Sequence, residues 1–284
     1  MPPFQLRFHG TTMPGTLYLV ATPIGNLEDI TLRALRVLRE ADLIACEDTR
    51  QTGKLLRHFE IIAKPMVSYH EHNEAARTAE LIAKLESDAT IALVSDAGTP
   101  LVSDPGYRLV TAAISAGIVV VPIPGASAVL SALSGAGLPT DAFRFCGFLP
   151  PKSGQRKKAL EALRGEDCTL VFYEAPHRIL DTLSDLSAVY SERPVVVARE
   201  LTKLHEEFLR GTADEVRAQL AARPSVKGEI VLLIGKGAPV IAETPVEDAV
   251  RELEQKGVPR MDAIKQVARE RGLSKREVYS KVTG

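Results

Sequence analysis

The sequence has few cysteines and no long apolar run, and both shortages limit the class of protein. Cys46, Cys146 and Cys168 are an odd number without a closely spaced pair, which argues against a disulfide framework and a structural zinc site. No stretch approaches the roughly 20 apolar residues that cross a bilayer. Residues 1–14 lack the apolar core of a secretory signal. We therefore expect a cytoplasmic protein with no membrane segment and a flexible leader over residues 1–14.

The chain also lacks a large charge of either sign. Lys and Arg number 35 against 36 Asp and Glu, which gives a net charge of −1. Such a balance does not favour binding nucleic acid through bulk charge, so any RNA contact must be local. The basic stretch 152–164 is the main candidate, with Lys152, Arg156, Lys157, Lys158 and Arg164 against the single acid Glu161. A solvated basic helix face would produce the same pattern.

Alternating apolar and helical-period segments predict an α/β fold. We expect strands at 16–21, 43–45, 90–94 and 118–121, and then at 143–148, 169–173, 195–198 and 230–234. The rhythm changes after the Pro-Ile-Pro-Gly run that ends at Gly125. This predicts an N-terminal α/β domain over 15–122, a C-terminal α/β domain over 123–237 and a helical tail over 244–284. Gly272 in that tail fits a helix-turn-helix or a plain helical hairpin.

Three loops of small and polar residues follow predicted strands. They are 22–26, 95–100 and 122–128, and Asp104 with Pro105 looks like the start of the helix after the second loop. Neither G-x-G-x-x-G nor G-x-x-x-x-G-K-[ST] occurs, which argues against a Rossmann dinucleotide site and a P-loop. Small residues at strand ends favour a flat adenosine held by main-chain bonds in an interdomain cleft. Three unrelated turns are the alternative.

Polar clusters also follow strands, namely 46–50, 68–72, 173–178 and 198–203. Such side chains at strand ends are often functional, although Glu47 with Arg50 is equally a plausible ion pair. His70 and His72 have no matching further ligands, so we expect no metal site.

Together, these motifs resemble the tetrapyrrole methylase superfamily. Within it they resemble the ribosomal RNA small subunit methyltransferase I family, which 2′-O-methylates a decoding-region cytidine of 16S rRNA, cytidine 1402. The resemblance covers about residues 15–237 through Leu-Val-Ala-Thr-Pro-Ile-Gly-Asn, Cys-Glu-Asp-Thr-Arg, Val-Ser-Asp-Ala-Gly-Thr-Pro, Pro-Gly-Ala-Ser-Ala and Tyr-Glu-Ala-Pro-His-Arg. It implies two α/β domains, a homodimer, and 16S rRNA or the 30S subunit as partner.

The resemblance also implies that S-adenosylmethionine lies folded in the cleft between the domains. The positions that would contact it are Pro23, Gly25, Asp96, Ala97, Gly98, Thr99, Pro100, Leu101, Val102, Ser127, Ala128, Glu229 and Ile230.

Methyl transfer to a ribose hydroxyl needs alignment of donor and acceptor and removal of one proton. A carboxylate or imidazole is the natural proton acceptor, and Glu47, Asp48, Glu174 and His177 are all candidates. Asp96 is an alternative partner for the amino group or the sulfonium charge of the donor. We expect RNA contacts from Lys152, Arg156, Lys157, Lys158, Arg178 and Arg199.

Two other functions fit parts of the sequence. A methylase of tetrapyrroles or other small molecules would need a wide apolar cleft, and the 5% aromatic content leans against it. A DNA-binding regulator could act through residues 244–284. Their nine basic and seven acidic residues make a DNA anchor of that kind doubtful.

Overall fold

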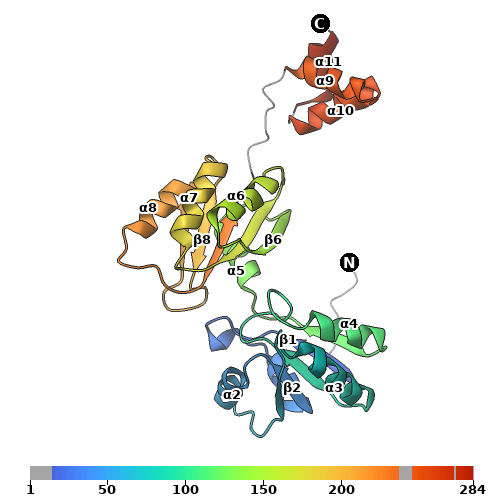
Figure 1. Ribbon diagram of the computed structural model, residues 1–284, viewed down its shortest axis with the longest axis vertical. Coiled ribbons are helices and arrows are strands. Elements are labelled where there is room, and N and C mark those ends of the chain that lie inside the picture. Colours follow the sequence, from blue (N-terminus) through green and yellow to red (C-terminus); the bar gives the residue numbers. More distant parts are fainter. Residues whose placement is uncertain (1–14, 237–244, 272, 284) are drawn as a thin grey trace.

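Two five-stranded sheets, built from successive parts of the chain and flanked by helices, dominate the computed structural model (Figure 1). The structure describes residues 15–236, 245–271 and 273–283. Within these residues, the helices are too short or too polar to cross a bilayer. The two sheets and their flanking helices confirm the predicted α/β fold.

The first sheet is entirely parallel, with strand order β3-β2-β4-β1-β5. Its strands are β1 (Thr16–Val20), β2 (Leu43–Cys46), β3 (Met66–Ser68), β4 (Ile91–Val94) and β5 (Val119–Ile123). Its flanking helices are α1 (Leu32–Glu40), α2 (Thr49–His58), α3 (Glu74–Glu86) and α4 (Tyr107–Ser115), and the short 3-10 helix η1 (Leu27–Asp29) follows β1. Because all five strands run the same way, the loops after them meet at one edge.

Helices cover both faces of this sheet, which explains why its central strands read as continuous apolar runs. Leu38 of α1 and Leu56 of α2 pack on one face against Ile44. Leu81 of α3 and Leu109 of α4 pack on the other.

The second sheet is mixed, with order β6-β7-β10-β8-β9. Only the β6–β7 pair is parallel, and the other three pairs are antiparallel. The strands are β6 (Phe143–Phe148), β7 (Thr169–Glu174), β8 (Val195–Arg199), β9 (Glu207–Gly211) and β10 (Ile230–Ile234). The helices are α5 (Ala128–Ala136), α6 (Ser153–Ala162), α7 (Ile179–Val189) and α8 (Ala213–Ala221).

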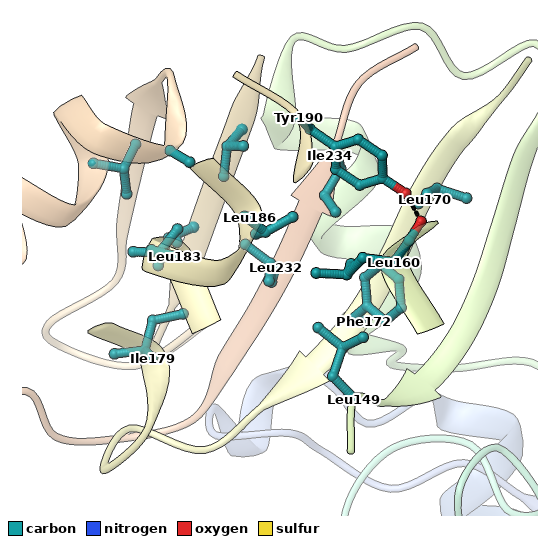
Figure 2. Packing of buried hydrophobic residues seen from close by; sticks show 14 of the residues in the cluster. Leu149, Leu160, Leu170, Phe172, Ile179, Leu183, Leu186, Tyr190, Leu232 and Ile234 are labelled. Carbon is teal, nitrogen blue, oxygen red and sulfur yellow. Dashed lines mark hydrogen bonds between the residues drawn. The ribbon is translucent and has the colours of Figure 1, made fainter. Parts of the chain in front are cut away.

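Successive side chains of β7 point to opposite faces of the second sheet, and each face has its own hydrophobic core. Phe172 points into the core under α6 and α7, where Leu160 and Leu183 lie (Figure 2). The Tyr190 hydroxyl donates to the Leu160 carbonyl in the same core. Val171 points to the opposite face, where α5 packs.

The predicted strands are confirmed to within two residues at each end, but other features differ. The sequence pattern gave no range for β3 and missed β9, and the predicted boundary after residue 122 falls inside β5. The helix predicted to begin at Asp104 begins at Tyr107, because Gly106 precedes it with a φ of 136° that does not continue a helix. Asp104 therefore lies in a loop.

The helical tail contains α9 (Val246–Gln255), α10 (Arg260–Glu270) and α11 (Lys275–Thr283). Val250, Ile264 and Val278 form the small core that these helices share. The leader over 1–14 and the predicted turn at Gly272 lie outside the described residues.

Candidate functional site

The loops after β1, β4 and β5 meet because these three strands are neighbours in the first sheet. Thr22 and Gly98 exchange two backbone hydrogen bonds, each of 2.9 Å, which join the first two loops. The Thr99 hydroxyl donates to the Ala126 carbonyl at 3.1 Å and so joins the third. The three loops predicted to line one cleft therefore form one connected unit.

Gly98 occupies a position in this unit that only glycine fills easily. Its φ is 82°, in the left-handed region that costs other residues about 1 kcal/mol or more. A Cβ atom there would lie 3.3 Å from the Ile24 Cγ2 atom. The loop can thus approach a ligand with its backbone.

A cavity of about 380 Å³ opens beside this unit, and we name it the first cavity. The loops after β1, β4 and β5 line it on one side, and β7, β10 and the segments preceding β10 and following β8 line it on the other. Its lining residues are Ile24, Ala97, Gly98, Thr99, Val102, Ser103, Asp104, Ser127, Ala128, Phe148, Tyr173, Glu174, Ala175, Pro176, Leu201, Gly228, Glu229, Ile230 and Val231. The cavity therefore lies between the two sheets.

A second hollow of about 510 Å³ adjoins the first cavity at Ile24, Ala97 and Glu229. Helix α2 forms one wall of this hollow with Gln51, Thr52, Lys54, Leu55 and His58. The other residues that line it are Thr22, Pro23, Gly25, Leu27, Ser95, Asp96 and Lys203. This hollow is the more polar of the two.

The turn after β1 also contacts the second half of the chain. The backbone N–H of Asn26 donates to the Thr202 hydroxyl at 3.1 Å. A Cβ atom on Gly25 would lie 2.4 Å from the Lys203 Cγ atom, so this close approach requires glycine. The Lys203 ammonium binds Glu200 at 2.9 Å and Glu229 at 2.8 Å. These contacts fix the edges of both hollows.

Acidic side chains gather where the loops of the first sheet meet the cavity. Burial, followed by the charge of Glu47, raises the pKa of the Asp104 carboxyl to about 6. Burial, followed by the charges of Asp96 and Glu71, also raises the pKa of Glu47. Asp96 accepts a hydrogen bond from the Asp48 backbone N–H at 3.1 Å. Asp48 itself caps α2 and pairs with Arg50, whose hydrogen bond lowers the Asp48 pKa to about 2.

The predicted cofactor contacts divide into three groups. Those that line the first cavity are Ala97, Gly98, Thr99, Val102, Ser127, Ala128, Glu229 and Ile230. Pro23, Gly25 and Asp96 line only the second hollow. Pro100 is buried and Leu101 packs into the core of the first sheet, so neither lines a hollow.

Asp104 and Phe148 line the first cavity but were not predicted as site residues, and Tyr173 was predicted only as part of the polar cluster 173–178. The Asp-Pro sequence at 104–105 looked like a helix start, whereas both residues lie in the loop before α4. Phe148 and Tyr173 occupy the ends of β6 and β7, and their rings lie 5.6 Å apart. The position of these aromatics at strand ends was the available signal.

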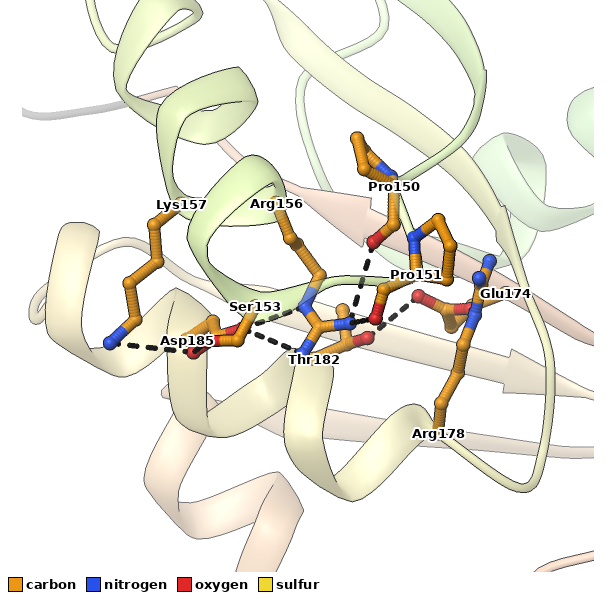
Figure 3. A network of polar contacts seen from close by, with 9 residues as sticks. All are labelled: Pro150, Pro151, Ser153, Arg156, Lys157, Glu174, Arg178, Thr182 and Asp185. Carbon is orange, nitrogen blue, oxygen red and sulfur yellow. Dashed lines mark hydrogen bonds and ion pairs between the residues drawn. The ribbon is translucent and has the colours of Figure 1, made fainter.

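Glu174, a predicted proton acceptor, lines the first cavity, but hydrogen bonds within the protein engage both of its carboxylate oxygens. Its side chain has no exposed surface, and its Oε1 atom accepts the Ala175 N–H at 2.7 Å. The same oxygen pairs with Arg178 (Figure 3). Its Oε2 atom accepts the Thr182 hydroxyl at 2.7 Å. The carboxylate thus stabilises the start of α7 through Thr182. It also pairs with Arg178, which was predicted to bind RNA. His177, the neighbouring candidate, is exposed and lines neither hollow.

Arg156 also has a different role from the one predicted. It is 2% exposed, and its Nε atom donates to Asp185 Oδ2 at 2.7 Å (Figure 3). Lys157 lies 3.5 Å from the other oxygen of the same carboxylate. A guanidinium this buried and paired is poorly placed to contact RNA phosphate, and we do not include Arg156 among the proposed RNA contacts. Lys152 and Lys158 remain exposed.

Arg199, the last predicted RNA contact, lies at the end of β8. Its Nε atom pairs with Glu207, and its Nη1 atom donates to the Lys227 carbonyl at 2.9 Å. Arg223 binds the same carboxylate. These contacts hold Arg199 in the sheet.

Residues 16–217 match the family described as Tetrapyrrole (Corrin/Porphyrin) Methylases, and the chain belongs to this family. Solved structures show the same fold. Diphthine synthase has a TM-score of 0.59 at 16% identity, with 78% of this chain and 90% of that chain covered. Uroporphyrin-III C-methyltransferase from Thermus thermophilus, complexed with S-adenosyl homocysteine, has a TM-score of 0.54 at 19% identity over 78% and 97% of the two chains.

Relatives of higher sequence identity narrow the assignment of the chain within this family. The ribosomal RNA small subunit methyltransferase I of Halalkalibacterium halodurans is 53% identical over 94% of each chain. The protein of that name from Synechocystis is 50% identical over 93% of this chain and 96% of its own. The one from Bacillus subtilis is 44% identical over 97% and 96%. Within the methylases, the chain belongs with the ribosomal RNA small subunit methyltransferase I proteins.

The Arg156–Asp185 pair should be a strong determinant of stability. We expect Arg156→Met to lower the free energy of unfolding by about 3–5 kcal/mol, because it leaves the Asp185 charge buried without its partner. The double variant Arg156→Met with Asp185→Leu should recover much of this loss. Urea denaturation measures both, with exposed Lys158→Met as the control. A change of less than about 1 kcal/mol for Arg156→Met would contradict the burial of this pair.

Proposed function

We propose that this protein transfers the methyl group of S-adenosylmethionine to the 2′-hydroxyl of a cytidine in the decoding region of 16S rRNA, cytidine 1402. The donor occupies the first cavity, and the acceptor nucleotide reaches it from the second hollow. The observation that carries this proposal is the first cavity, which three joined loops line on one side. It occurs in a chain whose relatives are named as small-subunit rRNA methyltransferases.

The residues of the first cavity suit this donor. Ala97, Gly98 and Ala128 have small side chains that leave room for a flat ring. Leu201 and Val231 supply an apolar wall. A volume of about 380 Å³ lies within the usual range for a cofactor pocket.

When bound, S-adenosylmethionine supplies a methyl carbon that is already activated toward a nucleophile. The chain has to hold donor and acceptor in line and accept the hydroxyl proton. Glu47 lines neither hollow, but it is half-buried beside Asp96, which lines the second hollow, and its carboxyl group is not fully engaged as that of Glu174 is. We therefore propose Glu47 as the proton acceptor. Its raised pKa makes it a stronger base than an ordinary glutamate, and above that pKa it is charged and able to accept the proton.

RNA binding in this proposal depends on the exposed cations at the start of α6. Lys152 caps this helix, Lys158 lies about 1.7 turns further on, and both are exposed to solvent. The substrate is 16S rRNA or the 30S subunit, which places the enzyme in the cytoplasm. We further propose a homodimer, which light scattering of the purified protein tests.

Methyl transfer is tested by incubating the protein with 30S subunits, with free 16S rRNA and with donor labelled in its methyl group. We expect label in the RNA fraction of at least one of these substrates. Label in neither would contradict RNA as the acceptor.

Replacing Gly98 by alanine should impair donor binding, because the substitution strains a left-handed backbone and pushes on Ile24. Isothermal titration calorimetry should show at least about tenfold weaker binding of S-adenosylmethionine, a loss of about 1.4 kcal/mol. Gly117→Ala is the matched control, since Gly117 has a φ of 72° and open space around its Cβ position. It should suffer similar strain and bind the donor normally. Equal affinity in Gly98→Ala and Gly117→Ala would contradict the placement of the donor.

Ala128→Leu tests the same placement without backbone strain. Ala128 opens α5 with helical geometry and lines the first cavity, so the larger side chain would fill space that the donor needs. Donor affinity should fall, while the far-ultraviolet circular dichroism stays that of the wild type.

Glu47→Gln should slow methyl transfer by about 10²- to 10⁴-fold in single-turnover reactions saturated with RNA and donor. The wild-type rate should rise with pH through the raised pKa of Glu47 and then level off, and the variant should lack this rise. His177→Ala, measured in parallel, should retain its rate if the exposed imidazole has no part in proton transfer. A near-normal rate for Glu47→Gln across the pH range would assign the proton to water or to another group.

Neutralising Lys152 and Lys158 together should weaken RNA binding and flatten its salt dependence. Loss of two phosphate contacts should reduce the slope of log K against log salt concentration by about 1.4–1.8. Lys84→Gln, an exposed change on α3, serves as the control and should leave the slope unchanged. An unaltered slope in the double variant would identify this face as ordinary solvated surface.

A further inference from the structure

Asp104 is an acidic side chain of the first cavity that the proposed chemistry does not yet use. It lies in the loop between β4 and α4 and faces the cavity together with Ser103 and Val102. Tyr173 of β7 lines the opposite wall, and the pKa of its hydroxyl is raised by burial and then by the charge of Asp104. The carboxyl group therefore acts across the cavity from one sheet to the other.

The groups that surround Asp104 do not neutralise it. Glu47 from the loop after β2 and Asp96 from the loop after β4 are acids, and together with burial they raise its pKa to about 6. The Ser95 side chain opposes them through a hydrogen bond. Across the cavity, Tyr173 is neutral at physiological pH and Glu229 is a further acid, itself paired with Lys203 at 2.8 Å. A positive charge inside the cavity would thus meet an acidic wall.

We propose that Asp104 makes the first cavity selective for the charge of the methyl donor, so that the sulfonium of S-adenosylmethionine binds in preference to the neutral thioether of S-adenosylhomocysteine. The proposal rests on the placement of the donor in the first cavity and is independent of the RNA target. Donor and product differ by one methyl group and one positive charge. Their other contacts are shared, so the change in the ratio of their affinities when the Asp104 charge is removed reports the effect of that charge.

The size of the effect follows from the electrostatics of a partly desolvated site. An opposite charge within about 4–6 Å commonly lowers the pKa of a carboxyl group by about 1–3 units. Because linkage is reciprocal, each unit corresponds to about tenfold tighter binding of the cation to the deprotonated protein. Methyl transfer removes the positive charge, and with it this attraction, so the product is released more readily.

Calorimetric titration of both ligands, without RNA, tests the proposal at about pH 8, where Asp104 is charged. Asp104→Asn should lower the preference for S-adenosylmethionine over S-adenosylhomocysteine by about tenfold or more. Asp104→Glu, which keeps the charge, should retain most of the preference. Glu80→Gln, which removes an exposed acid on α3, should retain all of it.

The wild-type protein provides a test that needs no variant. Below its pKa of about 6, Asp104 is protonated and neutral, so the preference should fall as the pH is lowered through this value. Near that pH, S-adenosylmethionine should displace protons on binding, and S-adenosylhomocysteine should displace far fewer. Titrations in buffers of different ionisation enthalpy measure these protons.

The outcomes separate this proposal from the donor placement itself. Equal weakening of both ligands by Asp104→Asn, or an unchanged ratio together with equal proton release in the wild type, would overturn charge selection by Asp104. Undiminished donor binding in Gly98→Ala and Ala128→Leu would instead overturn the placement of the donor.

Discussion

The two backbone hydrogen bonds between Thr22 and Gly98 are the constraint on which the candidate site depends. They join the loops after β1 and β4, which are adjacent strands of the parallel sheet. Thr99 extends this connection to the loop after β5. Because main-chain atoms hold the loops together, their side chains can be small, and a ligand can lie close to the backbone. The backbone at position 98 must in turn adopt a left-handed conformation, and glycine adopts it without the cost that other residues incur.

The same turn after β1 places the second half of the chain against the first. Ile24 packs with Leu201 and Val231, which belong to the second half, and Asn26 binds Thr202. Apolar burial therefore closes one wall of the first cavity, and polar contacts around Lys203 shape the rim that it shares with the second hollow. This turn contributes to both hollows, and its geometry determines how donor and acceptor can face each other.

Much of the fold could be predicted from the sequence, because apolar runs and helical periods report burial directly. The three loops could be predicted as well, since small residues after strands have few other uses at that edge. The charged residues could not be sorted in this way. Arg156 and Glu174 look like functional side chains, yet their partners Asp185 and Thr182 lie 29 and 8 positions away and only the folded chain reveals them. For Asp104, the local sequence itself was misleading. Asp-Pro is typical of a helix start, but the helix begins three residues later, after Gly106.

The proposed activity is methylation of a cytidine ribose of 16S rRNA. Mass spectrometry of nuclease digests tests it, using 16S rRNA from 30S subunits that lack the modification, before and after incubation with the purified protein and S-adenosylmethionine. We expect a mass increase of one methyl group on a single decoding-region cytidine, located on its ribose. A methyl group on a base, a methyl group at another site, or an unmodified RNA would contradict it.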